Sequence, residues 1–273
     1  MSRAELDFAI GLAATEGWNP GLHDADAFYQ ADPQGFLIAL LDGRPIGCIS
    51  AVSYGGHFGF IGLYIVVPEH RGKGYGIALW QAAMQRLKGH VIGLDGVVAQ
   101  QANYRQSGFQ LAYRNIRYCG TLWPAATTDQ RIHPLSRWPW EKIATYDRRY
   151  FQADRSAFLE AWIQQPDSQA LGFGKDGQLT GYGVIRRCGK GHKIGPLFAD
   201  DPEIARALLQ HLTATVPPGD EIYLDVPEIN PAAVQIAREL GLTTVFETAR
   251  MYIGEPPPIH LPGVFGVTTF ELG

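Results

Sequence analysis

A strand, a glycine-rich turn and a helix follow one another between residues 58 and 87, and this order constrains the fold more than any other feature. Residues 58–67 are mostly apolar and predict a buried strand, and residues 77–87 carry apolar side chains at helical spacing. The turn between them contains the run Arg-Gly-Lys-Gly-Tyr-Gly at residues 71–76. A strand that leads through glycines into a helix points backbone N–H groups and the positive helix end at one place, which favours phosphate binding.

Two common phosphate motifs do not fit this run. A P-loop needs a wider glycine spacing and ends in Lys-Ser or Lys-Thr, whereas Ile77 follows Gly76 here. The dinucleotide fingerprint Gly-x-Gly-x-x-Gly is one residue longer than the spacing from Gly72 to Gly76. The alternative to a phosphate site is a turn that only joins the strand to the helix.

A second run, Asn-Tyr-Arg-Gln-Ser-Gly-Phe at residues 103–109, follows a predicted strand over residues 91–99. Its tyrosine, Tyr104, has a phenol with a reference pKa near ~10, which stays protonated at neutral pH and can donate a proton to a thiolate. The alternative is a buried tyrosine that packs the helix against the sheet.

Together, the two runs resemble the GNAT family of N-acetyltransferases. The resemblance implies that acetyl-CoA is the cosubstrate, that the glycine loop binds its pyrophosphate, and that Tyr104 protonates the departing CoA thiolate. It also implies a contact between Asn103 and the pantetheine arm. The residues that the resemblance assigns to cofactor binding are Val66, Val67, Arg71, Gly72, Lys73, Gly74, Tyr75, Gly76, Ile77 and Asn103.

The same resemblance implies direct attack by a primary amine, either of a small molecule or of an amino terminus. Its general base stays unassigned, because the cofactor strand holds no carboxylate before Glu69. Water, Asp24 or Asp26 are the candidates, although helix capping is the favoured reading of both aspartates. The residues expected on the acceptor side are Trp18, Asn19, Asp24 and Tyr64, with plain core packing as the alternative for Trp18. A sensor that binds acetyl-CoA without turnover, or a transferase for a longer acyl group, are the competing functions.

Composition narrows the function further. The chain of 273 residues has a net charge of −4 and no Lys/Arg run, which argues against nucleic acid as a partner. No segment is apolar enough for a membrane span or a signal peptide. Three isolated cysteines and scattered histidines predict a cytoplasmic protein without a metal. Whether the chain forms a homodimer stays open.

The chain is predicted to be a mixed α/β protein that contains the same fold twice. A stretch without periodicity near residues 119–139 suggests a first domain over 1–125, a linker over 126–139 and a second domain over 140–273. Asp42-Gly43 is matched by Asp176-Gly177, and the 46 residues from Gly62 to Gly108 equal those from Gly195 to Gly241. Ordered matches at equal spacing indicate an internal repeat, with chance similarity as the alternative.

The second copy differs where the first carries its motifs. Asp200, Asp201 and Glu203 precede its helix in place of Arg71 and Lys73, and Ala237 stands where the first copy has Tyr104. Carboxylates at a helix N-terminus compete with phosphate and repel it. The layout resembles tandem-GNAT proteins of the YitH-like type. We therefore expect a C-terminal GNAT-like domain that lacks the pyrophosphate loop and closes the acceptor pocket.

Overall fold

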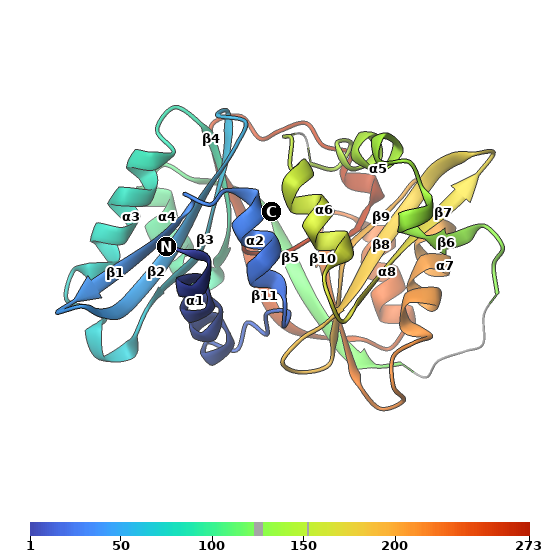
Figure 1. Cartoon of the computed structure of the whole chain (residues 1–273), viewed down its shortest axis with the longest axis horizontal. Coiled ribbons are helices and arrows are strands. Elements are labelled where there is room, and N and C mark those ends of the chain that lie inside the picture. Colours follow the sequence, from blue (N-terminus) through green and yellow to red (C-terminus); the bar gives the residue numbers. More distant parts are fainter. Residues whose placement is uncertain (123–127, 152) are drawn as a thin grey trace.

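The computed structural model describes residues 1–122, 128–151 and 153–273, and it places two halves side by side around one continuous sheet (Figure 1). The first half contains α1 (Arg3–Thr15), α2 (Asp24–Ala31), β1 (Phe36–Leu41), β2 (Arg44–Tyr54), β3 (Phe58–Val66), α3 (Tyr75–Arg86), β4 (Val91–Val97), α4 (Gln101–Gln106) and β5 (Gln110–Thr121).

The second half repeats this order of elements, which confirms the predicted duplication. Its elements are α5 (Trp140–Asp147), α6 (Ser156–Gln164), β7 (Ser168–Lys175), β8 (Gln178–Arg187), β9 (His192–Ala199), α7 (Pro202–Thr213), β10 (Glu221–Pro227), α8 (Pro231–Glu239) and β11 (Thr243–Ile253). Two short strands, β6 (Ile132–Pro134) and β12 (Val264–Gly266), flank the repeat.

Each copy begins its sheet with the same hairpin turn. Asp42 and Gly43 have φ values of 51° and 75°, and Asp176 and Gly177 have φ values of 52° and 72°. Two successive residues with positive φ match the right-handed twist of the flanking strands, and Asp-Gly is a preferred pair for such a turn. The matched dipeptides in the sequence therefore encode matched turns.

The two halves exchange their last strands. The order in the sheet is β1-β2-β3-β4-β11-β5-β10-β9-β8-β7-β6, with β12 attached to β9. Strand β11 of the second half pairs with β4, while β5 of the first half pairs with β10. The predicted boundary at residues 125–126 lies outside the described residues, and strand pairing crosses this division of the sequence. Part of the predicted linker, Ile132–Pro134, forms β6 and pairs with β7.

Helices cover both faces of the sheet. Successive strand residues point to opposite faces, so that Phe60 packs in the core beneath α1, α2, α5 and α6 while Ile61 packs beneath α3. The first of these cores is shared by the halves, because Phe28 of α2 stacks on Trp162 of α6 with ring centroids 6.1 Å apart. A third core lies beneath α7 and α8 in the second half.

Candidate active site

A cleft opens in the first half where two parallel strands separate. Strands β3 and β4 pair from Phe58 with Val91 to Ile61 with Leu94, and their pairing ends there. The cleft has a volume of about 440 Å³. Its lining comes from both halves and consists of Glu16, Trp18, Ile61–Val66, Arg71, Gly72, Gly76, Trp80, Leu94–Val97, Gln100, Tyr104, Phe246, Thr248, Phe270 and Glu271.

The glycine loop forms the mouth of this cleft at the start of α3. Gly72 and Gly74 have φ values of 72° and 89°, a backbone region that L side chains rarely adopt. Gly74 is the N-cap of α3, and no side chain bonds to the first turn of this helix. The loop therefore presents free N–H groups and a positive helix end, as a phosphate site requires.

The charged side chains of the loop are held close to its backbone. Arg71 donates from Nε to the carbonyl oxygen of Val66 at 2.7 Å and forms an ion pair with Glu16. Lys73 donates to the carbonyl oxygen of Glu69 at 2.7 Å. Six predicted cofactor residues are not in the lining set. Five of them border the mouth in sequence, namely Val67, Lys73, Gly74, Tyr75 and Ile77, and the sixth is Asn103 on α4.

Tyr104 reaches the cleft from α4. Its ring lies 5.6 Å from that of Trp80, and only 9 % of the residue is exposed. Burial raises the pKa of Tyr104 to about 12, with a smaller contribution from the neighbouring Tyr64, so the phenol is protonated at neutral pH. A Cβ atom on Gly96 would stand 2.2 Å from the Tyr104 ring, so the glycine gives the ring its place against β4.

Tyr64 is the second phenol in the cleft. It is half-buried, and its ring lies 5.6 Å from that of Trp80. A Cβ atom on Gly76 would stand 2.8 Å from the Tyr64 hydroxyl, so the position of this hydroxyl requires glycine at the end of the loop. Asn103 lies on the exposed side of α4, where its amide donates at 2.6 Å to Gln100, a residue of the lining.

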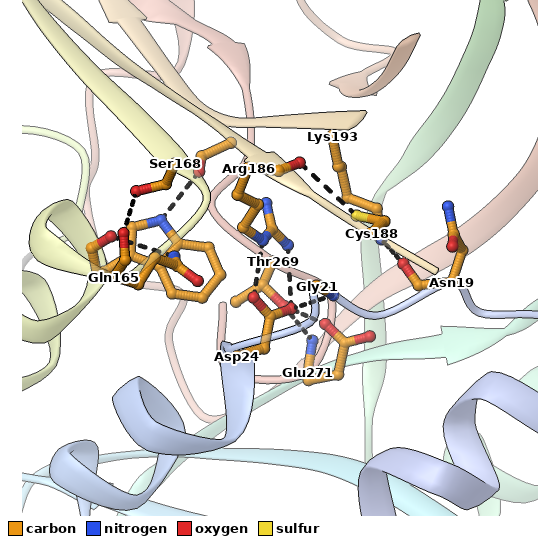
Figure 2. Close-up of polar contacts among 12 residues, drawn as sticks. Asn19, Gly21, Asp24, Gln165, Ser168, Arg186, Cys188, Lys193, Thr269 and Glu271 are labelled. Carbon is orange, nitrogen blue, oxygen red and sulfur yellow. Dashed lines mark hydrogen bonds and ion pairs between the residues drawn. The ribbon is translucent and has the colours of Figure 1, made fainter. Parts of the chain in front are cut away.

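The loop between α1 and α2 is fastened to the second half. Trp18 lines the cleft, and its carbonyl oxygen accepts from Arg117 at 2.6 Å. The side chain of Asn19 exchanges hydrogen bonds of 2.8 and 2.9 Å with the backbone of Lys190, and its carbonyl oxygen accepts from Lys193 at 2.7 Å (Figure 2). Asn19 therefore positions the loop that carries Trp18.

Asp24 has a structural place between the halves. It is 1 % exposed, accepts from Nε of Arg186 at 2.8 Å and from the backbone N–H of Gly21 at 2.8 Å (Figure 2). A parallel buried pair joins Arg117 of β5 to Asp225 of β10, with both bonds at 2.7 Å. Asp24 is thus engaged away from the cleft lining.

Four lining residues from the second half could not be found by motif. Phe246 and Thr248 reach the cleft because β11 lies beside β4, and Phe270 and Glu271 arrive on the segment 264–273. The hydroxyl of Thr248 is buried and has no hydrogen-bond partner within the described chain. No local motif in residues 243–253 marks these positions.

The equivalent region of the second copy is filled by protein. Strands β9 and β10 pair only from His192 with Ile222 to Ile194 with Leu224, after which β12 pairs with β9. The Asp201 side chain caps α7 by accepting from the N–H of Ile204 at 2.9 Å, and Asp200 accepts from Arg149 at 2.8 Å. These contacts occupy the strand opening and the helix N-terminus that the first copy leaves accessible.

Residues 1–122, 128–151 and 153–273 also bear on metal binding and on membrane insertion. No group of three or more His, Cys, Asp and Glu residues in these ranges has the arrangement of a metal site. No helix in the same ranges is both long and apolar enough to cross a membrane.

The cleft between separated parallel strands, with a glycine loop at its mouth, belongs to an acyltransferase fold. Residues 6–109 match the family described as Acetyltransferase (GNAT) family, and residues 143–266 match the Acetyltransferase (GNAT) domain. The chain belongs to the GNAT family and carries two of its domains in tandem, as the sequence predicted. It is accordingly an acyltransferase.

Relatives and solved structures agree with this assignment. Holothin acyltransferase of Pseudoalteromonas sp. is 26 % identical, over 96 % of this chain and 89 % of its own. The uncharacterized N-acetyltransferase YitH of Bacillus subtilis is 24 % identical, over 85 % of this chain and 83 % of its own. A candidate acetyltransferase from Pyrococcus horikoshii has a TM-score of 0.79 at 22 % identity, covering 91 % of this chain and 83 % of the other. A tandem GNAT protein from the clavulanic acid pathway has a TM-score of 0.64 at 12 % identity, covering 94 % and 98 %.

Proposed function

We propose that this protein transfers an acetyl group from acetyl-CoA directly to a primary amine. The observation that carries the proposal is the single cleft that contains both a phosphate-binding loop and a buried, protonated tyrosine. The loop Arg71–Gly76 lies at the mouth and Tyr104 lies inside. The GNAT family uses acyl-CoA, and the residues present fit this cosubstrate.

The glycine loop would bind the pyrophosphate of CoA. Free N–H groups at the start of α3 supply hydrogen bonds, and Arg71 and Lys73 supply positive charge beside them. The pantetheine arm would then follow the opening between β3 and β4, where the unpaired edge of β3 offers backbone groups from Gly62 to Val66. In this arrangement the thioester lies between the strands.

The reaction needs two contributions from the chain. N–H groups of the segment Tyr64–Val66 would polarise the thioester carbonyl, as an oxyanion hole does. The amine nitrogen attacks this carbon, the C–N bond forms, and the C–S bond breaks. Tyr104 would donate its proton to the departing sulfur, a step that typically contributes about 10²–10⁴-fold to the rate.

Turnover assays test the proposal and separate it from its competitors. Purified protein is mixed with acetyl-CoA and a panel of primary amines, CoA release is followed with a thiol reagent, and the products are identified by mass spectrometry. Amine-dependent CoA release with an N-acetylated product supports the proposal. Acetyl-CoA binding without release by any amine would indicate a sensor instead. Faster release from butyryl- or hexanoyl-CoA would indicate a longer acyl group, as the broader name of the Pseudoalteromonas relative allows.

A further inference from the structure

The segment 264–273 joins the two halves and contributes Phe270 and Glu271 to the cleft. Strand β12 pairs with β9, and the N–H of Val267 donates to the carbonyl oxygen of Asp225 at 2.9 Å. Further along, the carbonyl oxygen of Leu272 accepts from the Tyr54 hydroxyl at 3.0 Å, which fixes the segment to the first half. Glu271 lies between these anchors, so its position is set by both copies of the fold.

The Glu271 carboxylate differs from the other acids of the cleft. Of the three carboxylates in the lining, Glu16 is paired with Arg71, and Asp95 is paired with Arg250. Glu271 is 5 % exposed and accepts from the Thr269 hydroxyl, and across the described ranges it forms no ion pair (Figure 2). It is therefore a buried acceptor in the cleft lining that forms no ion pair among the described residues, although the buried guanidinium groups of Arg117 and Arg186 act on it through space.

Glu271 and Tyr104 lie on opposite faces of the sheet. Tyr104 packs with Trp80 in the core beneath α3, whereas the backbone of Glu271 lies against Gly62 on the face covered by α1 and α2. The cleft passes between them through the separated strands. A group bound between β3 and β4 would thus meet the phenol on one side and the carboxylate on the other.

The surroundings of Glu271 are aromatic. Trp18, Phe246 and Phe270 line the same part of the cleft, and the rings of Phe246 and Phe270 also cover the buried guanidinium of Arg117 at 5.8 and 4.8 Å. The one cationic side chain of the lining set, within the ranges that the structure describes, is Arg71 at the phosphate loop. On this side of the cleft an acceptor would therefore meet rings and the Glu271 carboxylate, while the Arg117 guanidinium is covered by the rings and paired with Asp225.

We propose that Glu271 binds the acceptor amine and takes its proton, and that the acceptor is a primary amine with an aromatic body and no acidic group. This inference rests on the proposed function. The nitrogen electron pair forms the C–N bond, the C–S pair leaves on sulfur with the proton of Tyr104, and the surplus N–H proton passes to Glu271. Glu271 then releases its proton to solvent and Tyr104 regains one from solvent, so that acetyl-CoA and amine give amide and CoA. An acceptor carboxylate would be desolvated beside Glu271 without a partner, which excludes free amino acids.

The first test compares Glu271→Gln with Glu271→Asp and the parent protein. Calorimetry should show unchanged acetyl-CoA affinity in both variants, because residue 271 is not part of the phosphate loop, and thermal melting should show intact folds. With 2-phenylethylamine, Glu271→Gln should lower kcat/KM by about 10²-fold or more, the usual size for a lost base, and Glu271→Asp should lose less.

A weakly basic amine separates a chemical role from a structural one. O-Benzylhydroxylamine is mostly unprotonated at neutral pH and loses its N–H proton more readily after attack. Its kcat/KM should therefore fall much less in Glu271→Gln than that of 2-phenylethylamine. An equal loss of kcat/KM with both amines would show that Glu271 has only a structural role. A Glu271→Gln variant that reacts at the parent rate with both amines would show that Glu271 takes no part in the reaction.

The acceptor class is tested with matched substrates on the parent protein. 2-Phenylethylamine and phenylalanine methyl ester should be acetylated, and phenylalanine itself should react at least about tenfold more slowly, since a buried unpaired charge costs more than 1.4 kcal/mol. Equal use of phenylalanine and its ester would overturn the acceptor class. A parent protein that releases no CoA with any amine would contradict the proposed function itself. An active parent whose Glu271→Gln variant is equally active would contradict only the role of Glu271.

Discussion

The backbone carbonyl oxygen of Glu271 lies 2.1 Å from the position that a Cβ atom on Gly62 would take. Gly195, the equivalent glycine of the second copy, is approached in the same way, with the carbonyl oxygens of Val267 and Thr268 each 2.6 Å from its Cβ position. One segment thus crosses the same point of both copies, and each crossing requires glycine. The matched glycines of the repeat are sites of close backbone approach.

Replacing Gly62 by alanine should displace the segment that carries Glu271. We expect Gly62→Ala to lower the free energy of unfolding by roughly 1–3 kcal/mol, as overpacking does, and to lower amine acetylation. Urea unfolding and CoA release measure the two effects. Gly11→Ala in the exposed face of α1 is the control, since nothing lies within 4 Å of its Cβ position, and it should gain about 0.5–1 kcal/mol. If Gly62→Ala has the stability and activity of the parent, the segment 264–273 moves away from the new methyl group without cost.

The absence of a side chain at Gly74 should be required for acetyl-CoA binding, in addition to the backbone conformation that glycine allows. Gly74→Val should abolish acetyl-CoA binding, because the side chain would stand where the pyrophosphate approaches the loop. Gly89→Val is a matched control, with a φ value of 88° against 89° and open space around both Cβ positions. Both variants should lose similar stability, and Gly89→Val should keep parent affinity. Equal affinity of the two variants by calorimetry would place the pyrophosphate elsewhere.

Tyr104→Phe should keep acetyl-CoA affinity and lower kcat by about 10²-fold or more. Because burial raises the pKa of Tyr104 to about 12, the parent should show no alkaline loss of activity from this group below about pH 11. Tyr64→Phe, which removes the other phenol of the cleft, should have the smaller effect. A Tyr104→Phe variant with the parent rate would leave Tyr104 a packing residue.

The local motifs of the site could be predicted because each is contiguous in sequence. The glycine loop, Tyr104 and the Asp-Gly hairpins depend on backbone conformations that a few neighbouring residues impose. The fold class followed from the order of elements, and the duplication followed from matched glycines.

The residues that the second half contributes to the cleft could not be predicted, because they depend on long-range pairing. Nothing in residues 243–253 states that β11 inserts between β4 and β5 of the first half, so Phe246 and Thr248 gave no local signal. Glu271 reaches the cleft through contacts with residues about 75 and 210 positions earlier in the chain, at Gly195 and Gly62. Asp24 likewise has a helix-start pattern in the sequence, and only the structure shows its partner Arg186.

The buried pair of Asp225 and Arg117 should make stability pH-dependent. Burial alone would raise the pKa of Asp225, but the charge and hydrogen bonds of Arg117 outweigh burial and lower it. A lowered folded-state pKa stabilises the protein above the unfolded pKa, and this stability is lost as pH falls through the folded value. Asp225→Asn should cost about 3–5 kcal/mol at neutral pH, because Arg117 stays buried without its counter-charge.

The pH dependence itself is the decisive part of that prediction. The difference in stability between the parent and Asp225→Asn, followed by chemical unfolding, should narrow as the pH falls into the acidic range. Asp176→Asn, in a turn that accepts either residue, should follow the parent at every pH. A difference in the free energy of unfolding that stays constant on acidification would mean that the Asp225 carboxylate contributes to stability through packing alone.

The number of acetyl-CoA molecules bound per chain tests the central claim most directly, namely that two copies of one fold build one catalytic cleft. In the second copy, β12 fills the strand opening and Asp201 caps α7, so calorimetric titration should give one site per chain. That site should disappear in Gly74→Val and persist in Asp201→Asn, which keeps the cap. Two sites per chain, the second surviving in Gly74→Val, would contradict the account.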